Sequence, residues 1–157
     1  MPWSHGEGSS ELDHAHDDCI FCRIIAGRAP CHRVHEDELT ITFLDIFPVT
    51  PGHALVVTKE HFENIFEASE ESLQAVAASA RRVSGAIRRC LAPEGLAVFQ
   101  LNGAAAGQSV FHYHMHLLPR SAGGSMKLHT RVPGDEQELR QIAERLVAAL
   151  AEVESRD

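Results

Sequence analysis

The sequence predicts an α+β fold with a largely antiparallel sheet. Segments 33–36 and 39–45 have the pattern of a hairpin, and one long amphipathic helix is followed by further strand segments, which is typical of this class. At 157 residues the chain is expected to form one domain with a sizeable core. We place this domain at 18–157, after a flexible tail over 1–17 that is rich in Gly, Ser, His and acidic residues.

In the first half of the chain, turn-forming residues separate short apolar segments. Gly27 ends a helical turn expected over 20–26, and Asp37 lies near the hairpin turn. A loop rich in proline and glycine, 48–52, then leads to a nearly continuous apolar strand over 54–58.

The long helix is defined by its cap and by its apolar spacing. Ser69 is a favourable N-cap, and two acidic residues follow it at the positive end of the helix dipole. Pro93 and Gly95 end the helix. Its apolar stripe consists of Leu73, Val76, Ala77, Ala80, Val83 and Ile87.

A second helix is expected near the C-terminus, after a strand over 96–101. It starts near Asp135, where Glu138 completes a capping box. Its apolar stripe consists of Leu139, Ile142, Ala143, Leu146, Val147 and Leu150.

The most informative segment is a strand predicted over 112–118, in which three histidines alternate with apolar residues and which Pro119 ends. Strand side chains point alternately to opposite faces, so the histidines share one face and the apolar residues pack into the core. Partly buried imidazoles need hydrogen-bond partners or a metal, and imidazole can act as nucleophile, acid, base or ligand. We interpret the row as functional, against the alternative of a histidine-rich surface strand. Its members are His112, His114 and His116.

Charge and hydropathy argue against two classes of protein. The net charge is −8 and no basic patch is visible, so we expect no nucleic acid as a general partner. No apolar run reaches membrane-spanning length and the N-terminus does not resemble a signal peptide, so we expect no membrane association and a cytoplasmic location.

The four cysteines divide into a spaced pair and two single residues. Cys19 and Cys22 have the spacing of a metal-binding knuckle, for which a redox dithiol is the alternative. No thioredoxin-like strand pattern precedes the pair. Cys31 and Cys90 have no partner pattern and are interpreted as small, partly buried apolar side chains.

A loop of small residues, 102–109, leads into the histidine strand. Gly103 and Gly107 can adopt backbone angles closed to other residues, so the loop can direct several N–H groups at an anion. Alone it could equally be a plain turn, but beside the histidines it suits a phosphate held next to a nucleophile. Neutral donors are added by Asn102, Gln108 and Ser109.

Segment 102–118 resembles the signature of the histidine triad (HIT) family, in which His-x-His-x-His alternates with apolar residues. The similarity runs from about residue 19 to residue 120 and is greatest to the Hint-like bacterial branch, which carries a zinc-binding CxxC. Thr58 stands where that branch usually has proline. Further motifs in family order are 19–25, 43–46, 51–53, 59–61 and 107–112.

The resemblance implies a HIT-like fold, a five-stranded antiparallel sheet with a long central helix and a C-terminal helix, and a homodimer in which two sheets join. It also implies a purine nucleotide substrate, cleaved at the α-phosphate of a nucleoside phosphoramidate or a dinucleoside polyphosphate. His114 would be the nucleophile that forms a covalent nucleotidyl-histidine, which water then hydrolyses. His116 would bind phosphate oxygens and assist proton transfer. His53 would complete the proton network, or act only as a hydrogen-bonded neighbour.

The same resemblance implies how a nucleotide is held. Asn102, Gln108 and Ser109 match phosphate-binding positions. Asp45 matches the residue that accepts hydrogen bonds from the ribose hydroxyls. The apolar walls around the base would be Phe21, Ile24, Phe43 and Ile46, which without the resemblance would be ordinary core.

A zinc site is implied as well. Cys19, Cys22, His61 and His112 match the positions that hold one structural zinc ion per subunit. Two thiolates and two imidazoles make a closed tetrahedral site, so a metal-activated hydrolase is disfavoured. The alternative is an empty site with two buried free thiols.

Two other functions stay open. A nucleotide-binding or regulatory module with little turnover would not need a nucleophile at 114. Nucleotidyl transfer to an acceptor other than water usually goes with a His-Pro-His triad in this superfamily, and Tyr113 stands in the place of that proline.

Overall fold

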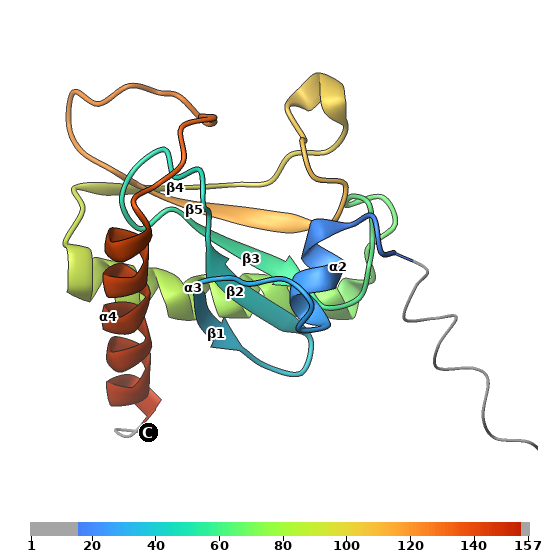
Figure 1. Cartoon of the computed structure of the whole chain (residues 1–157), viewed down its shortest axis with the longest axis horizontal. Helices are drawn as coiled ribbons and strands as arrows, with labels where there is room; N and C mark the ends of the chain where they lie inside the picture. The colour runs from blue at the N-terminus through green and yellow to red at the C-terminus, as the bar shows by residue number, and fades with distance from the viewer. Residues whose placement is uncertain (1–15, 155–157) are drawn as a thin grey trace, which may run out of the picture.

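The structure is a computed structural model that describes residues 16–154 (Figure 1). The predicted tail therefore lies outside the described residues, except for its last two positions. Among the described residues no helix is both long and apolar enough to cross a membrane. The elements follow in the order α2 (Ile20–Ile25), β1 (Arg33–Glu36), β2 (Thr40–Leu44), β3 (Ala54–Thr58), α3 (Glu70–Leu91), β4 (Gly95–Phe99), the 3₁₀ turn η1 (Ala104–Ala106), β5 (His114–Arg120) and α4 (Glu136–Glu154).

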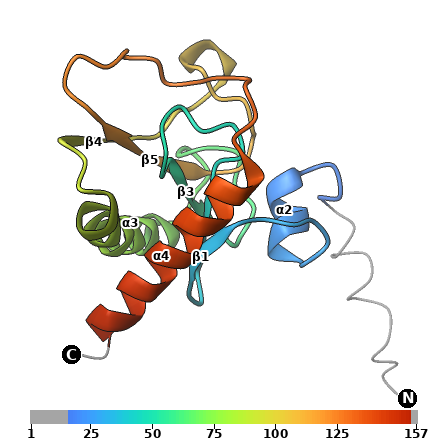
Figure 2. The same cartoon turned by 60° about the vertical axis from the view of Figure 1, so that its left-hand side comes forward.

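The five strands form one antiparallel sheet in the order β1-β2-β3-β5-β4. Helix α3 lies along one face, with α4 packed against α3 and β1, and α2 lies apart from both helices (Figures 1 and 2). Side chains of α2 pack with the opposite face of β2 and β3. This is the α+β architecture with a central and a C-terminal helix that the sequence predicts.

β3 shows why segment 54–58 is apolar throughout. Its residues 54 and 56 belong to the core beneath α3, whereas Leu55 and Val57 belong to a second cluster beneath α2. Both faces are covered, so all five residues of β3 are buried. Leu55 is paired with His116 and Val57 with His114, and paired residues share a face. The register of β3 and β5 therefore places both histidines on the α2 side.

α3 begins and ends as predicted. The Ser69 hydroxyl accepts the Ser72 N–H at 3.2 Å, and two glutamates occupy the first turn. At the other end Ala92 adopts a left-handed conformation with φ 44°. That conformation costs a non-glycine residue about 1 kcal/mol, and the proline that follows cannot continue the helix.

The buried faces of α3 and α4 are narrower than the apolar stripes predicted from the sequence. Ala77 in α3 and Val147 in α4 belong to the predicted stripes, but both are exposed. Each follows a fully buried neighbour, Val76 or Leu146, by one residue, which turns it about 100° away from the core. Asp135 caps the start of α4 as predicted, since its Oδ1 accepts the N–H of Glu138 at 2.9 Å.

The histidine strand begins two residues later than predicted. β5 starts at His114, and His112 lies in the bend before it. The intervening Tyr113 donates its N–H to the carbonyl of Phe62 at 2.7 Å, so this stretch pairs with the loop after β3. The apolar positions 113, 115 and 117 pack into the core beneath α3 as expected.

Pro119 does not end the strand but lies inside β5, which is a correction to the sequence prediction. It lies beyond the last residue of β5 that pairs with β3. Its carbonyl accepts the Thr50 hydroxyl at 2.6 Å on that side. In a strand the N–H and the carbonyl of one residue point to the same side, so an N–H at position 119 would also face away from β4. The absence of this N–H in proline therefore removes no hydrogen bond between β5 and β4.

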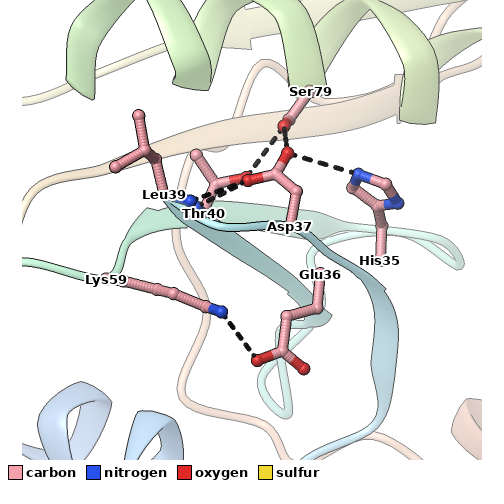
Figure 3. A network of polar contacts seen from close by, with 7 residues as sticks. All are labelled: His35, Glu36, Asp37, Leu39, Thr40, Lys59 and Ser79. Atoms are coloured by element: carbon pink, nitrogen blue, oxygen red, sulfur yellow. Dashed lines mark hydrogen bonds and ion pairs between the residues drawn. The ribbon is translucent and has the colours of Figure 1, made fainter. Parts of the chain in front are cut away.

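Asp37 ties the hairpin turn to α3 (Figure 3). Its Oδ1 accepts the N–H groups of Leu39 at 3.0 Å and Thr40 at 2.8 Å, and the Thr40 hydroxyl at 3.0 Å. Its Oδ2 accepts the hydroxyl of Ser79, in α3, at 2.9 Å. Burial by itself raises the pKa of the Asp37 carboxyl, but these hydrogen bonds outweigh it and hold that pKa below its ordinary value.

We expect Asp37→Ala to lower the free energy of unfolding by about 2–3 kcal/mol, because the N–H groups of Leu39 and Thr40 lose their acceptor and the buried Thr40 and Ser79 hydroxyls, 2.8 Å apart, keep only each other as partners. Asp37→Asn tests the charge. The folded pKa lies below the unfolded one, so the stabilisation is complete above the unfolded pKa and is lost as pH falls through the folded pKa. Urea unfolding at about pH 5 and about pH 2.5 should therefore show a larger loss in wild type than in Asp37→Asn. Glu38→Gln, at an exposed neighbour, should follow wild type, and equal losses in wild type and Asp37→Asn would contradict the assignment.

Candidate functional site

The four predicted metal ligands meet at one place. Cys19 is the N-cap of α2 and its sulfur accepts the N–H of Cys22, so the start of the helix sets the spacing of the two thiols. His61 lies in the loop after β3 and His112 lies before β5. One ligand atom from each of the four lies within 4.8 Å of the others. We call this group the thiol–histidine cluster.

The distances within the thiol–histidine cluster suit a tetrahedral ion. His61 Nδ1 lies 3.1 Å from His112 Nδ1, and Cys22 Sγ lies 3.2 Å from the first and 3.5 Å from the second. Donor atoms of a tetrahedral zinc site are about 3.3–3.8 Å apart, so one of these three separations falls in that range and two are slightly shorter. His112 Nε2 lies 2.7 Å from the carbonyl of Thr58 and carries the hydrogen, which leaves Nδ1 with a free lone pair for a metal.

Burial favours the neutral forms of these groups. It lowers the pKa of His112 to about 4 and raises that of Cys22 to about 12, with the hydrogen bond and charge of Cys19 adding to the second shift. A Zn²⁺ ion would therefore displace thiol protons, whereas His112 is already in its ligand form. Four protein ligands leave no position for water, so the site suits a structural ion.

A cavity of about 310 Å³ lies next to the thiol–histidine cluster and extends along α2, β2 and β5. We call it the histidine cavity. The predicted site residues that line it are Phe21, Ile24, Phe43, Asp45, Ile46, His53, Ser109, His114 and His116.

The backbone orients the imidazole of His114. Its Nδ1 lies 2.6 Å from the carbonyl oxygen of His112, so Nδ1 carries the hydrogen and Nε2 keeps a free lone pair. Phe21 packs edge-on against the ring, with centroids 5.0 Å apart. Burial lowers the pKa of His114, which favours the neutral ring. A neutral imidazole with one free nitrogen is the form that a nucleophile needs.

His53 and His116 form a hydrogen-bonded pair with a defined direction. His53 Nδ1 accepts the Val49 N–H at 3.2 Å, so neutral His53 carries its hydrogen on Nε2. That nitrogen donates to His116 Nδ1 at 3.0 Å, which leaves the hydrogen of His116 on Nε2. Phe99 stacks on the His116 ring with centroids 4.4 Å apart. The histidine cavity therefore contains an N–H donor, from His116, and a free lone pair, from His114.

The same pair, with Asp45, has ligand atoms close enough together for a metal ion. However, His53 Nε2 bears a hydrogen as long as Nδ1 accepts from the backbone, so it has no lone pair for a metal. Burial lowers the pKa of His53 to about 4 and that of His116 to about 2. We therefore describe this group as a chain of neutral imidazoles.

Asp45 has one oxygen bound and one near His53. Oδ1 accepts the N–H of Phe47 at 2.9 Å, and Oδ2 lies 3.8 Å from His53 Nε2. Burial raises the pKa of Asp45 although the Phe47 hydrogen bond opposes the shift. The second oxygen is thus the one that could accept donors from a ligand.

The predicted phosphate-binding side chains are not all in the histidine cavity. Ser109 lines it, but Gln108 is buried and uses its amide to hold the loop. Gln108 Oε1 accepts the Gly103 N–H at 2.7 Å, and Nε2 donates to the carbonyls of Glu63 at 2.6 Å and Val110 at 3.1 Å. The structure therefore gives Gln108 a positioning role.

Asn102 is also part of the loop framework. Its amide pairs with that of Gln100, and its Oδ1 accepts the N–H of Ile65 at 2.8 Å. The loop N–H groups at 106, 107 and 108 donate to carbonyls of the same loop, so these three are not directed at an anion as the sequence suggested. Gly103 and Gly107 do adopt positive φ, at 89° and 99°.

Sequence reasoning missed several residues that line the histidine cavity. Leu128, His129 and Thr130 belong to the segment between β5 and α4, which carries no periodic pattern. Cys31, interpreted as an ordinary partly buried side chain, also lines the wall. The only sequence feature that marks His129 is its place in the chain, soon after the three histidines.

Comparisons with known proteins agree with this geometry. A family model described as the HIT domain matches residues 26–123. The chain belongs to the HIT domain family. A zinc-bound histidine triad family protein from Mycobacterium smegmatis superimposes with a TM-score of 0.78 at 36% sequence identity, covering 88% of this chain and 97% of that one. The predicted family and the HIT-like fold are thereby confirmed.

Three curated relatives extend the comparison. The protein called hit of Bacillus subtilis is 47% identical over 111 residues, which is 71% of this chain and 77% of that protein. An adenosine 5′-monophosphoramidase of Schizosaccharomyces pombe is 42% identical over 102 residues, 65% of this chain and 74% of that one. An adenylylsulfatase of Arabidopsis thaliana is 35% identical over 117 residues, 74% of this chain and 59% of that one.

We expect the purified protein to contain zinc and Cys22→Ser to lose it, with a Tm lower by about 5–10 °C because the ion would join α2 to the start of β5. Elemental mass spectrometry and scanning calorimetry measure the two effects. Cys90→Ser is the matched control, since Cys90 lies outside the cluster and contacts the Arg145 carbonyl. Full zinc content in Cys22→Ser would show that the ion is held elsewhere.

Proposed function

We propose that the chain is a nucleotide hydrolase that cleaves purine nucleoside phosphoramidates or dinucleoside polyphosphates at the α-phosphate, through a covalent nucleotidyl-histidine. The observation that carries this proposal is the orientation of His114, a neutral imidazole that lines the histidine cavity with Nε2 free. The relatives named as an adenosine 5′-monophosphoramidase and an adenylylsulfatase support a hydrolase.

The proposed reaction has two displacements. First, the Nε2 lone pair of His114 forms a bond to the α-phosphorus while the bond to the leaving group breaks. A leaving amine keeps the bonding electron pair and takes a proton from water, whereas a polyphosphate departs as an anion. Water then bonds to phosphorus, the bond to His114 breaks, and one proton is released to solvent. His114 returns to its neutral form.

The neighbouring groups would stabilise and position the phosphoryl group. His116 Nε2–H would donate to a phosphoryl oxygen on which negative charge develops, and the Ser109 hydroxyl would be a second donor. His53 acts through His116, because it holds that ring in the tautomer that donates. Gln108 and Asn102 would contribute by holding the loop that carries Ser109.

The apolar part of the histidine cavity would hold the base. Phe21 and Phe43 meet edge to face with centroids 5.3 Å apart, and Ile24 and Ile46 line the same wall. Asp45 would accept hydrogen bonds from the ribose hydroxyls through the oxygen that the Phe47 N–H leaves free.

We further propose structural zinc in the thiol–histidine cluster and a homodimer formed along β4. The donor set supports the first, and the second is supported by the sheet order, which places β4 at an edge, and by Val98, which is 51% exposed there. The cytoplasmic location and the lack of a nucleic-acid partner stay predictions.

The nucleophile can be tested by a single turnover with adenosine phosphoramidate, quenched in base and analysed by intact mass. We expect a nucleotidyl adduct on wild type and none on His114→Ala, whose turnover should fall by roughly a thousandfold or more while adenosine monophosphate still binds. His32→Ala is the matched control, because His32 pairs with Glu136 at 3.1 Å outside the cavity. Binding without adduct or product in wild type would favour a nucleotide-binding module instead.

The pH dependence tests the state of the same ring. Burial lowers the pKa of His114, and it holds those of His53 at about 4 and His116 at about 2, so all three should stay neutral below the ordinary range of histidine. We expect the rate constant for adduct formation, measured by rapid quench, to stay constant from about pH 8 to about pH 6.5 and to fall only at lower pH. Zinc content measured over the same range controls for loss of the metal. An acid limb centred at about pH 6.5 or higher would contradict a neutral, desolvated nucleophile.

A further inference from the structure

The segment between β5 and α4 is anchored at both ends. It forms the long arch at one end of the sheet in Figures 1 and 2. The Arg120 guanidinium donates to the carbonyls of Ser125 and Lys127, the second at 2.8 Å. At the other end the Gly134 N–H donates to the Ile46 carbonyl at 2.8 Å. These contacts tie the segment to the strand and the loop that line the histidine cavity.

His129 brings this segment into contact range of a predicted catalytic residue. Its ring lies edge-on to that of His116, with centroids 6.0 Å apart. Its Nε2 lies so close to Gly107 that a Cβ at that glycine would be 3.3 Å away. The ring therefore reaches from His116 to the loop that carries Ser109, although it is itself exposed to solvent.

Basic side chains are few among the described residues that line the histidine cavity. Among the described side chains that line it, none is lysine or arginine. Burial lowers the pKa values of His53, His114 and His116, so these rings are uncharged at neutral pH. Asp45 also lines the histidine cavity, and its carboxyl group supplies no positive charge. Among the described residues that line the cavity, His129 is the one basic side chain that is exposed to solvent.

We propose that His129 selects substrates whose leaving group is an anion, by donating a charge-assisted hydrogen bond to that group. The inference rests on the proposed hydrolysis at the α-phosphate. An anionic leaving group gains negative charge as its bond to phosphorus breaks, whereas an amine takes up a proton and departs neutral. A protonated His129 near the leaving group stabilises the first transition state by its charge, whereas it assists the second only if it transfers its proton to the leaving nitrogen. His129 determines specificity in this scheme, and His114 is still the nucleophile.

The test compares three substrates that transfer the same adenylyl group. Adenosine phosphoramidate releases ammonia, adenylylsulfate releases sulfate, and diadenosine tetraphosphate releases a nucleoside polyphosphate. We expect His129→Gln to lower kcat/KM about tenfold for the two anionic leaving groups and less than about twofold for the phosphoramidate. His129→Lys keeps the charge and should restore most of the loss.

Lys127→Gln is the matched control, because it removes a positive charge two residues away from a side chain that does not line the cavity. It should leave all three substrates unchanged. A loss confined to adenylylsulfate or to diadenosine tetraphosphate would support the proposal and identify which anion His129 meets. Equal effects of His129→Gln on all three substrates, including no effect, would overturn it while leaving the hydrolase intact. No hydrolysis of any of the three by wild type would instead overturn the proposed function.

Discussion

The site depends on a few backbone groups that decide which nitrogen of each histidine carries the hydrogen. The Thr58 carbonyl takes the Nε2–H of His112, and the carbonyl of His112 takes the Nδ1–H of His114. In the histidine cavity the Val49 N–H donates to Nδ1 of His53. A change of tautomer would leave a buried polar group without a partner, at a cost of about 1–3 kcal/mol. Identical side chains thereby acquire different capacities: His112 has a lone pair facing the thiols, His114 has a lone pair facing the cavity, and His116, oriented by His53, has an N–H donor in the same cavity.

The fold supplies the rigidity that these contacts need. β3 is enclosed on both faces, and its register with β5 leaves no freedom to move His114 or His116 to the other side of the sheet, because a slip of one residue would exchange the two faces. α2 covers these residues and provides both the two thiols and the apolar wall that includes Phe21. The thiol–histidine cluster and the histidine cavity thus share one short helix, whose cluster residues Cys19 and Cys22 alternate with cavity residues such as Phe21 and Ile24.

Much of this could be predicted from the sequence, because the signals are local. Caps such as Ser69 and the alternation around His114 depend on neighbours in the chain, and the structure confirms them. The predictions that differ depend on distant partners. The start of β5 is shifted because Tyr113 bonds to Phe62, and the Gln108 amide turns to carbonyls on either side of the loop instead of to the cavity. His129 comes from a segment whose position is set by Arg120 and Gly134, for which no spacing rule exists.

One consequence follows from the contact that orients His114, because the acceptor is the main chain of His112 and not its ring. The imidazole of His112 and its carbonyl serve different ends of the site. An evolving lineage could replace the ring, and so lose the proposed metal site, without removing the atom that sets the tautomer of His114. The side chain at position 112 could therefore change when the supply of metal changes. The backbone at that position could not move without loss of the carbonyl that binds His114.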